Sequence, residues 1–310
     1  MAVSTTLTEL KTNRIKRLDL KVGYSCINDC LFCVVADKRL RGDKTTDEIK
    51  QELIASYEEG RREVVFTGGE AAIRKDIFEL VSFARNLGFL NIQMQTNGRM
   101  FSSLDFAVKM ARCGMTEFGP SLHGQNARIH DALTRRTGSW RETVLGIHNV
   151  KKIGIRTLTN TVITQKNYRN LPEIASLLVK LKVDQFQLAF VHIMGNALKY
   201  YRKVVPRVST VIPFIKDALD VGIKAGVRVM VEAVPFCLLS GYERYASEFY
   251  LPSTQVKEVG YQIDDFGKVR KEEGKCKFQS CLECRRYRVC EGPWKEYPRL
   301  FGEKEFKPVL

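Results

Sequence analysis

Residues 17–33 read RLDLKVGYSCINDCLFC and place three cysteines directly after a segment with the pattern of a β-strand. Apolar residues stand at every second position of that segment, which is typical of a strand with one buried face. Cys26, Cys30 and Cys33 then follow with the spacing C-x3-C-x2-C. Three thiolates on one short loop can hold an iron–sulfur cubane and leave its fourth iron open for a small molecule.

A chance grouping of cysteines, or a zinc site that a distant residue completes, would produce the same spacing. A structural zinc ion usually takes four protein ligands, and no fourth Cys or His lies near the three. The spacing also differs from the C-x2-C-x2-C run of ferredoxins.

Outward from this loop, the chain alternates between strand and helix patterns as far as Val234. Such alternation builds a parallel sheet, and six or seven units favour an open barrel over a flat doubly wound sheet. We therefore predict an α/β fold, a partial (β/α)6 barrel of TIM type. The predicted strands are 17–24, 63–67, 91–95, 117–122, 157–164, 185–192 and, as the last one, 227–234. The predicted helices are 45–59 with Thr46 as N-cap, 76–87, 104–113, 140–153, 171–181 and a long helix within 206–225.

Several of these strands carry polar side chains on one face. Helices cover the outer face of a parallel barrel, so the apolar residues belong there and the polar ones point into the lumen. Buried polar groups without partners cost about 1–3 kcal/mol each, so such a lumen would hold water or a polar ligand. A half-exposed sheet is the alternative. The inward set is Asp19, Lys21, Gln93, Gln95, Gln185 and Gln187, against Leu18, Leu20, Val22, Ile92, Met94, Phe186, Leu188 and Phe190.

The composition is that of a globular protein, since 44% of the 310 residues are apolar and 27% are charged. This apolar fraction argues against disorder. No stretch approaches the roughly 18 apolar residues of a membrane span, and the N-terminus lacks the apolar core of a secretory signal. The formal charge of +15 is spread along the chain, so nucleic acid is not the expected partner. Nine cysteines are too few for a disulfide scaffold and indicate a reducing compartment, which we expect to be the cytoplasm.

A change of composition after Pro235 predicts a domain boundary, with a barrel over residues 1–235 and a small domain over 236–310. The second part lacks long apolar periods, so we expect bound metal to stabilise it. It carries the spacing C-x4-C-x2-C-x5-C, for which a zinc ribbon is the alternative to an iron–sulfur site. The cysteines of this run are Cys276, Cys281, Cys284 and Cys290.

The first cysteine loop, at its place after the first predicted strand, resembles the cluster loop of the radical S-adenosylmethionine (SAM) superfamily. The resemblance extends to Gly68, Gly69 and Glu70, which look like the family's GGE element. Glycine there lets the backbone approach a ligand closely. The resemblance implies that the three cysteines hold a [4Fe–4S] cluster. It also implies that Phe32 lies near the adenine of SAM and that the GGE stretch receives the methionine amino group.

Further matches to this superfamily lie at the ends of later predicted strands, where αβ barrels carry their active sites. They are Asn97, Ser121 and Asn160. In related enzymes a serine at the position of Ser121 contacts SAM, and a downstream arginine binds its carboxylate. Arg135 and Arg136 both fit that arginine, and the sequence does not choose between them.

The second cysteine run resembles the auxiliary-cluster segment of the SPASM and twitch branches of the superfamily. Those branches also place a cysteine soon after the last barrel strand, and Cys237 fits that description. Five cysteines then compete for four places on one auxiliary [4Fe–4S] cluster. The resemblance favours Cys237, Cys281, Cys284 and Cys290, with Cys276 as the alternative fourth ligand.

The resemblance implies reductive cleavage of SAM to a 5′-deoxyadenosyl radical, which abstracts hydrogen from a substrate, with ferredoxin or flavodoxin as electron donor. Relatives with auxiliary clusters often modify peptides, so a peptide or a cofactor precursor is the expected substrate. The alternatives are a small-molecule dehydrogenase of the same superfamily and a zinc-stabilised nucleic-acid-binding protein. His123, His130 and His192 are expected to be hydrogen-bonded structural residues, and Trp294 is expected to pack the tail.

Overall fold

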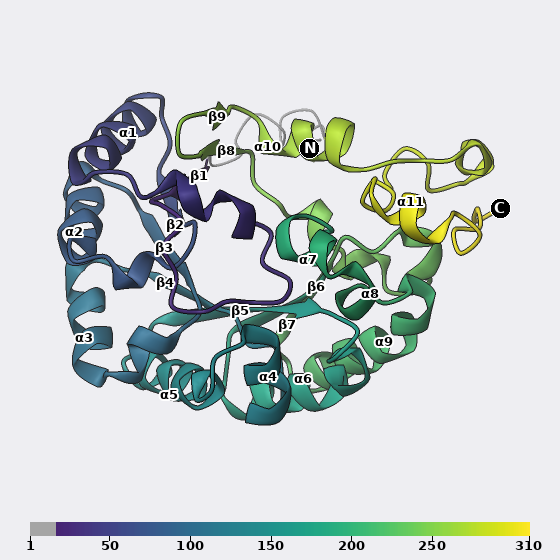
Figure 1. The fold of residues 1–310 in the computed structure, drawn as a ribbon, viewed down its shortest axis with the longest axis horizontal. Coiled ribbons are helices and arrows are strands. Elements are labelled where there is room, and N and C mark those ends of the chain that lie inside the picture. The colour runs from purple at the N-terminus through teal and green to yellow at the C-terminus, as the bar shows by residue number, and fades with distance from the viewer. Residues whose placement is uncertain (1–16) are drawn as a thin grey trace, which may run out of the picture.

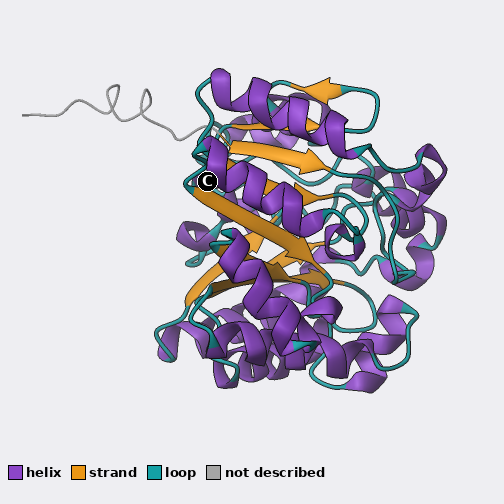
Figure 2. Ribbon diagram, turned by 90° about the vertical axis from the view of Figure 1, so that its left-hand side faces the viewer, coloured by secondary structure: helices purple, strands orange, loops and turns teal. Residues whose placement is uncertain are grey.

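The structure is a computed structural model that describes residues 17–310. Residues 1–16, in which the sequence predicts no secretory signal, lie outside the described part. Within it, one curved sheet has the strand order β7-β6-β5-β4-β3-β2-β1-β8-β9. All neighbouring strands are parallel except β8 and β9. Figure 1 shows the larger helices outside the arc of strands, and Figure 2 shows the same sheet from the side, so the predicted partial barrel is confirmed.

The strands and helices have the following bounds. The strands are β1 (Arg17–Lys21), β2 (Glu63–Thr67), β3 (Asn91–Thr96), β4 (Glu117–Pro120), β5 (Arg156–Ile163), β6 (Gln185–Phe190), β7 (Arg228–Glu232), β8 (Thr254–Lys257) and β9 (Gln262–Ile263). The helices are α1 (Thr46–Glu58), α2 (Ile77–Leu87), α3 (Leu104–Cys113), α4 (Ala127–Thr134), α5 (Ser139–Lys152), α6 (Leu171–Lys180), α7 (Gly195–Lys199), α8 (Tyr201–Val204), α9 (Val208–Lys224), α10 (Phe266–Val269) and α11 (Tyr297–Phe301).

The start of α1 shows how local sequence fixes an element. Thr45, and not Thr46, is the N-cap, and its side chain accepts a hydrogen bond from the backbone N–H of Glu48. The Glu48 carboxylate accepts the N–H of Thr45 at 2.6 Å in return. This reciprocal pair is a capping box, which satisfies two otherwise unpaired donors at the helix start.

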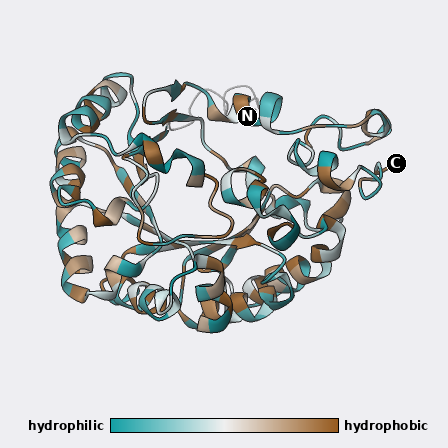
Figure 3. Cartoon of the chain, viewed as in Figure 1, coloured by the Kyte–Doolittle hydropathy of each residue, from teal (hydrophilic) through white to brown (hydrophobic). Residues whose placement is uncertain are grey.

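The alternating strand faces behave as the sequence predicts in β1 and β3, but Phe190, predicted on the outer face of β6, lines the cavity because the chain leaves the strand there. Leu18, Leu20 and Met94 are fully buried beneath the outer helices. Lys21 and Gln95 line a cavity inside the barrel instead. In Figure 3 the long helices carry both hydrophobic and hydrophilic residues, as helices that cover a sheet must. The inner face of the sheet is therefore polar and faces a cavity.

Several short elements were not predicted, among them β8, β9 and α4. The sequence predicts 227–234 as the last strand, whereas β8 adds to the other side of β1 and continues the sheet. Strand β8 follows the change of composition after Pro235, where the alternation of strand and helix patterns has stopped. Helix α4 was also missed, because its eight residues follow an irregular stretch and begin at the Asn126 cap. Among residues 17–310, no helix combines the length and apolar character that crossing a membrane requires.

Candidate functional site

One cavity of about 410 Å³ lies at the carboxyl ends of the parallel strands. Strands β1 to β7 each contribute a residue at or near their carboxyl end to the wall of this cavity. Active sites of αβ barrels lie at this end of the strands. The volume falls within the range of about 300–1,000 Å³ that small-molecule sites occupy. Examples from successive strands are Lys21, Thr67, Thr96, Ser121, Phe190 and Glu232.

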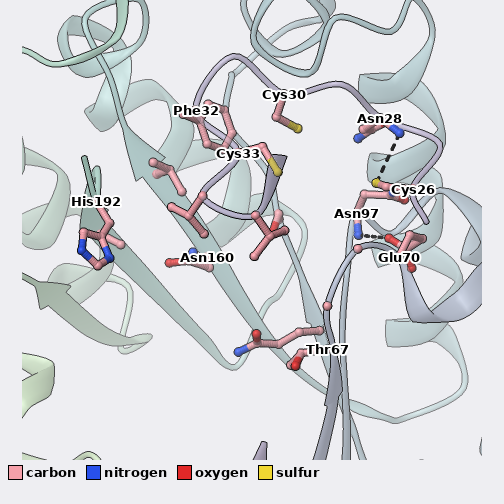
Figure 4. Close-up of a pocket in the computed structure, with 18 of the residues that line it drawn as sticks. Cys26, Asn28, Cys30, Phe32, Cys33, Thr67, Glu70, Asn97, Asn160 and His192 are labelled. Carbon is pink, nitrogen blue, oxygen red and sulfur yellow. Dashed lines mark hydrogen bonds between the residues drawn. The ribbon is translucent and has the colours of Figure 1, made fainter. Parts of the chain in front are cut away.

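The three cysteines of the loop after β1 all line this cavity, together with Phe32 (Figure 4). The N–H of Asn28 donates to the Sγ of Cys26 at 3.4 Å. Burial raises the pKa of the Cys26 and Cys30 thiols. A thiolate in such surroundings is stable only when a bound cation compensates its charge, and thiolates are the ligands of iron–sulfur clusters.

Three arginines hold the chain between the first two cysteines. Arg39 Nη1 lies 3.2 Å from Asp29 Oδ1, and Arg135 Nη2 lies 2.7 Å from Asp29 Oδ2. Arg99 Nη1 donates to Asn28 Oδ1 at 3.0 Å. These charge-assisted contacts fix the cysteine loop, since long loops without such ties are mobile.

Neither Arg135 nor Arg136 is among the residues that line the cavity, and both side chains are exposed. Arg135 ends α4 with a left-handed φ of 57° and reaches the site through its ion pair with Asp29. The arginine on the cavity wall is Arg39, in the short 3-10 helix Ala36–Arg41. Arg39 belongs to no recognisable motif, so its position on the cavity wall was not predicted from the sequence.

Gly68 and Gly69 bring two loops into backbone contact. A Cβ on Gly68 would lie 2.1 Å from the carbonyl oxygen of Gly23, and one on Gly69 would lie 2.2 Å from that of Ser25. The N–H of Gly69 donates to Gly23 O at 2.8 Å, and the N–H of Glu70 donates to Ser25 O at 2.7 Å. Any side chain at either glycine would push the GGE stretch away from the loop that carries the cysteines.

Glu70 is a buried anchor at the end of β2. Its Oε1 accepts from Thr96 Oγ1 at 2.6 Å and from the N–H of Ala72 at 3.2 Å. Its Oε2 accepts from the N–H of Asn97 at 2.6 Å, the second dashed line in Figure 4. Burial raises the pKa of Glu70 against these hydrogen bonds, which favour its charged form. The carboxylate thus joins the ends of β2 and β3 at the cavity wall.

Asn97 and Asn160 each leave a buried polar atom unpaired at this wall. Asn97 Nδ2 is a donor without a partner, and Asn160 Oδ1 is an acceptor without one. Ser121 lies beside Asn160, because a parallel bridge joins the two residues. Each unpaired group costs about 1–3 kcal/mol unless something binds it. A ligand with both hydrogen-bond acceptors and donors would satisfy them.

Two of the predicted structural histidines are hydrogen-bonded. His123 Nδ1 accepts the N–H of Val162 at 3.2 Å, and His130 Nδ1 accepts the N–H of His123 at 3.1 Å. His123 also lines the cavity, and its ring lies edge-on to Phe32 with centroids 4.6 Å apart. It therefore supports the aromatic residue of the cysteine loop.

His192 and Trp294 differ from what the sequence predicts. The His192 ring has no hydrogen-bond partner among the described residues, and it stacks on Trp294 at 3.7 Å with an interplanar angle of 9°. Both residues line the cavity, so Trp294 belongs to the site as well as to the tail. Burial, with Lys275 and Lys295 nearby, lowers the pKa of His192 to about 4. The sequence around Trp294 carries no pattern that predicts its place on the cavity wall.

A second pocket lies among the residues after β7. It is lined by Cys237, Cys281, Cys284 and Cys290, whereas Cys276 is not among its lining residues. The N–H of Phe278 donates to Cys281 Sγ at 3.5 Å, and that of Val309 donates to Cys284 Sγ at 3.3 Å. Across residues 17–310, no three side chains of His, Cys, Asp or Glu converge closely enough to hold a single metal ion. The pocket nevertheless brings together the four cysteines that the sequence favours.

Comparisons with known proteins agree with this geometry. The pattern that defines the radical SAM superfamily matches residues 20–178, just over half of the chain. A probable GTP 3′,8-cyclase of Sulfurisphaera tokodaii is 27% identical over 195 residues, which cover 61% of each chain. An AdoMet-dependent heme synthase of Oleidesulfovibrio alaskensis is 26% identical over 187 residues, 60% of this chain and 48% of the other. The aligned region thus spans half to three fifths of these relatives.

A likeness in fold extends over nearly the whole chain. SuiB of Streptococcus suis, solved with the precursor peptide SuiA bound, aligns with a TM-score of 0.68 at 17% identity. The alignment covers 97% of this chain and 77% of SuiB. Because it includes the residues after β7, the likeness in fold is not restricted to the barrel.

Proposed function

Because the chain belongs to the radical SAM superfamily, we propose that it cleaves SAM reductively and uses the resulting 5′-deoxyadenosyl radical to abstract hydrogen from a substrate. A [4Fe–4S] cluster on Cys26, Cys30 and Cys33 would supply the single electron that this cleavage needs. The observation that carries the proposal is the position of these three thiols on the wall of the cavity at the carboxyl ends of the strands. With only three cysteine ligands, one iron stays open for SAM.

The residues around the cysteines would bind and orient SAM. Asn97 Nδ2 and Asn160 Oδ1 are unpaired until a ligand supplies an acceptor and a donor. Phe32 offers an apolar surface to the adenine, and Ser121 a hydroxyl beside Asn160. Gly68, Gly69 and Glu70 would receive the methionine end, with Glu70 setting the direction of the Asn97 backbone.

The arginines would keep the cysteine loop in position. Arg39 and Arg135 share Asp29, so their charges lie next to the loop and favour bound thiolates. Arg135 and Arg136 both lie outside the cavity lining. We therefore assign the expected binding of the SAM carboxylate to neither of them. Arg39 is the guanidinium that a carboxylate in the cavity would meet.

Cys237, Cys281, Cys284 and Cys290 would hold one auxiliary [4Fe–4S] cluster in the second pocket. Four cysteine ligands leave no open iron there, so this cluster would transfer electrons and stabilise the tail. Support comes from the two backbone N–H groups that donate to Sγ atoms, since hydrogen bonds to sulfur tune such clusters. This is the SPASM- or twitch-like feature of the proposal.

The substrate class we propose is a peptide or a cofactor precursor. SuiB, which shares the fold, binds a precursor peptide. The cyclase and heme synthase relatives, by their names, act on small molecules, which keeps a small-molecule substrate as the second candidate. Ferredoxin or flavodoxin would donate the electron, and the reducing cytoplasm would keep the nine cysteines from forming disulfides.

The test is an anaerobic preparation of the full chain with its metal content measured. We expect a brown protein with broad absorption near about 400 nm and about eight iron atoms, four for each of two clusters. With dithionite and SAM it should release 5′-deoxyadenosine and methionine. A colourless protein with stoichiometric zinc and no 5′-deoxyadenosine would overturn the proposal in favour of a zinc-stabilised protein.

A further inference from the structure

The cavity has a second wall, away from the cysteines. Figure 4 shows His192 on one side of the pocket and Cys26, Glu70 and Asn97 on the other. His192 follows β6, and Glu232 ends β7, the edge strand of the sheet. None of the residues expected to bind SAM lies on these two strands. The wall they form, with Trp294 behind it, is therefore free for a substrate.

Glu232 presents one free carboxylate oxygen to this part of the cavity. Its Oε2 accepts a hydrogen bond from Gln187 Nε2 at 2.7 Å, and the structure gives the carboxylate no other hydrogen bond. Its Oε1 is not among the buried polar atoms that lack partners, so this oxygen remains accessible. Because Glu232 lines the cavity, that access is from the cavity.

The charges behind this wall do not balance. Arg270 pairs with Glu291 at 2.7 Å and lies 3.8 Å from Glu248. Lys275 is buried, with its Nζ unpaired by hydrogen bonds and 3.7 Å from the centroid of Trp294. Glu232 feels the charges of all four of these residues. Among Glu232 and the four residues whose charges act on it, three carboxylates face two cations, and Glu232 is the carboxylate that lines the cavity.

The stacked pair of His192 and Trp294 adds a neutral surface to the same cavity. The centroid of the His192 ring and the Nζ of Lys275 each lie 3.7 Å from the Trp294 ring. Because one face has no room for both at that distance, they lie on opposite faces of Trp294. Lys275 is thus screened from the cavity by Trp294 and His192. Its charge stabilises the buried carboxylates without competing for a ligand at Glu232.

We propose that this wall is a subsite for a primary ammonium group of the substrate, which the free oxygen of Glu232 binds. The inference rests on the proposed function, because it names the substrate group that would be held opposite SAM. A carboxylate with one free oxygen and no ion pair among the described residues gains most from a compact cation that donates hydrogen bonds. The unprotonated nitrogen of neutral His192 is a further acceptor on the same wall.

The test compares n-butylammonium with 1-butanol, which match in size and differ in charge. Each is titrated calorimetrically into the reconstituted protein with SAM bound, under anaerobic conditions at one pH. We expect the ammonium ion to bind at least about tenfold more tightly than the alcohol, as one desolvated charge-assisted hydrogen bond allows. The net charge of +15 works against unspecific cation binding. Equal affinity for the two probes would overturn the proposal.

Three variants locate the preference. Glu232→Gln should remove it, and Glu232→Asp, which keeps the charge, should retain part of it. Glu248→Gln is the matched control, because it removes a charge from the same cluster at a residue that does not line the cavity. Loss of the preference in the control alone, or its survival in Glu232→Gln, would contradict binding at Glu232.

Release of 5′-deoxyadenosine by the same preparations separates this inference from the proposed function. If dithionite-reduced protein yields 5′-deoxyadenosine but shows no ammonium preference, only the subsite is wrong. If it yields none, the proposed function fails whatever the amine does. Should Glu232→Gln not fold, the comparison of the two probes on the unmodified protein still decides the matter.

Discussion

At the scale of single residues, His192 is an imidazole kept neutral by its surroundings. Burial and two nearby lysines hold its pKa at about 4, whereas an unfolded chain would have the usual value near 6.5. A histidine with a depressed folded pKa contributes its stability in full above the unfolded value. That stability is lost as the pH falls toward the folded value. The loss for His192 therefore lies between about pH 6.5 and pH 4.

We predict that His192→Gln flattens this part of the pH profile of stability. The free energy of unfolding of the unmodified protein should fall by on the order of 3 kcal/mol more than that of the variant between those two pH values. Pulse proteolysis in urea at several pH values measures it. His148→Gln, at an exposed site on α5, is the control and should follow the unmodified protein. Parallel profiles for His192→Gln would contradict the neutral assignment.

Glu70 gives a second prediction at this scale. Three donors point at its two oxygens, so Glu70→Gln turns an acceptor into a donor that faces donors. We expect a loss of about 1–3 kcal/mol in unfolding free energy and weaker SAM binding, because the Asn97 backbone loses its anchor. Urea unfolding and equilibrium dialysis with SAM measure the two effects.

The matched control for Glu70 is Glu63→Gln on the same strand. Glu63 pairs with Arg17 at 3.1 Å at the opposite end of β2, far from the cavity lining. A peripheral ion pair of this kind contributes up to about 1 kcal/mol and should leave SAM binding unchanged. If both variants weaken SAM binding equally, the anchoring role of Glu70 is wrong.

At the scale of elements, the tail after β9 packs Trp294, Tyr297 and Phe306 into the core, and the cysteines of the second pocket join its remaining loops. We predict that Cys281→Ala or Cys284→Ala makes residues 264–310 sensitive to protease and removes about four iron atoms. The protected part should extend past Pro235 to β9, because β8 pairs with β1. Limited proteolysis with mass spectrometry and iron counts measure this.

Cys237→Ala and Cys276→Ala decide the fourth ligand of that pocket. Cys237 lines it, whereas Cys276 Sγ lies 3.8 Å from the carbonyl oxygen of Pro293. Cys237→Ala should therefore resemble Cys281→Ala, and Cys276→Ala should change little. The reverse pattern would make Cys276 the ligand. If neither changes iron content or cleavage, the assignment of four of the five cysteines fails.

What the sequence could predict at this scale depended on the length of each element. Strands of five or more residues show their alternation, so β1, β3 and β6 and their inward polar faces were found. Strand β4 is no longer than β8, but it stands within the alternation of strands and helices, whereas β8 follows the change of composition after Pro235. The site motifs were visible because each is local in sequence. Arg39, Glu232 and Trp294 were not, because only the closed barrel brings them to one cavity.

At the scale of the whole molecule, one stretch of chain joins the two cysteine sites. Gly292 and Pro293 line the second pocket, and the next residue, Trp294, lines the first cavity. The antiparallel bridge between Lys275 and Trp294 holds this stretch in place. The barrel and the tail are thus continuous through the sheet and through this contact, although their cysteines serve separate pockets.

Replacing Cys26, Cys30 and Cys33 together by Ala should therefore separate the two proposed functions of the molecule. The ion pairs of Asp29 and the hydrogen bond from the N–H of Leu31 to the carbonyl oxygen of Leu133 hold the loop without using a thiol. The variant loses only the hydrogen bond that the N–H of Asn28 donates to Cys26 Sγ. The fold and the auxiliary site should persist, with iron falling from about eight to about four atoms per chain. Reductive cleavage of SAM should stop, because the electron and the open iron both belong to this cluster. If dithionite still yields 5′-deoxyadenosine from the triple variant, the cysteines after β1 do not hold the cluster that binds SAM.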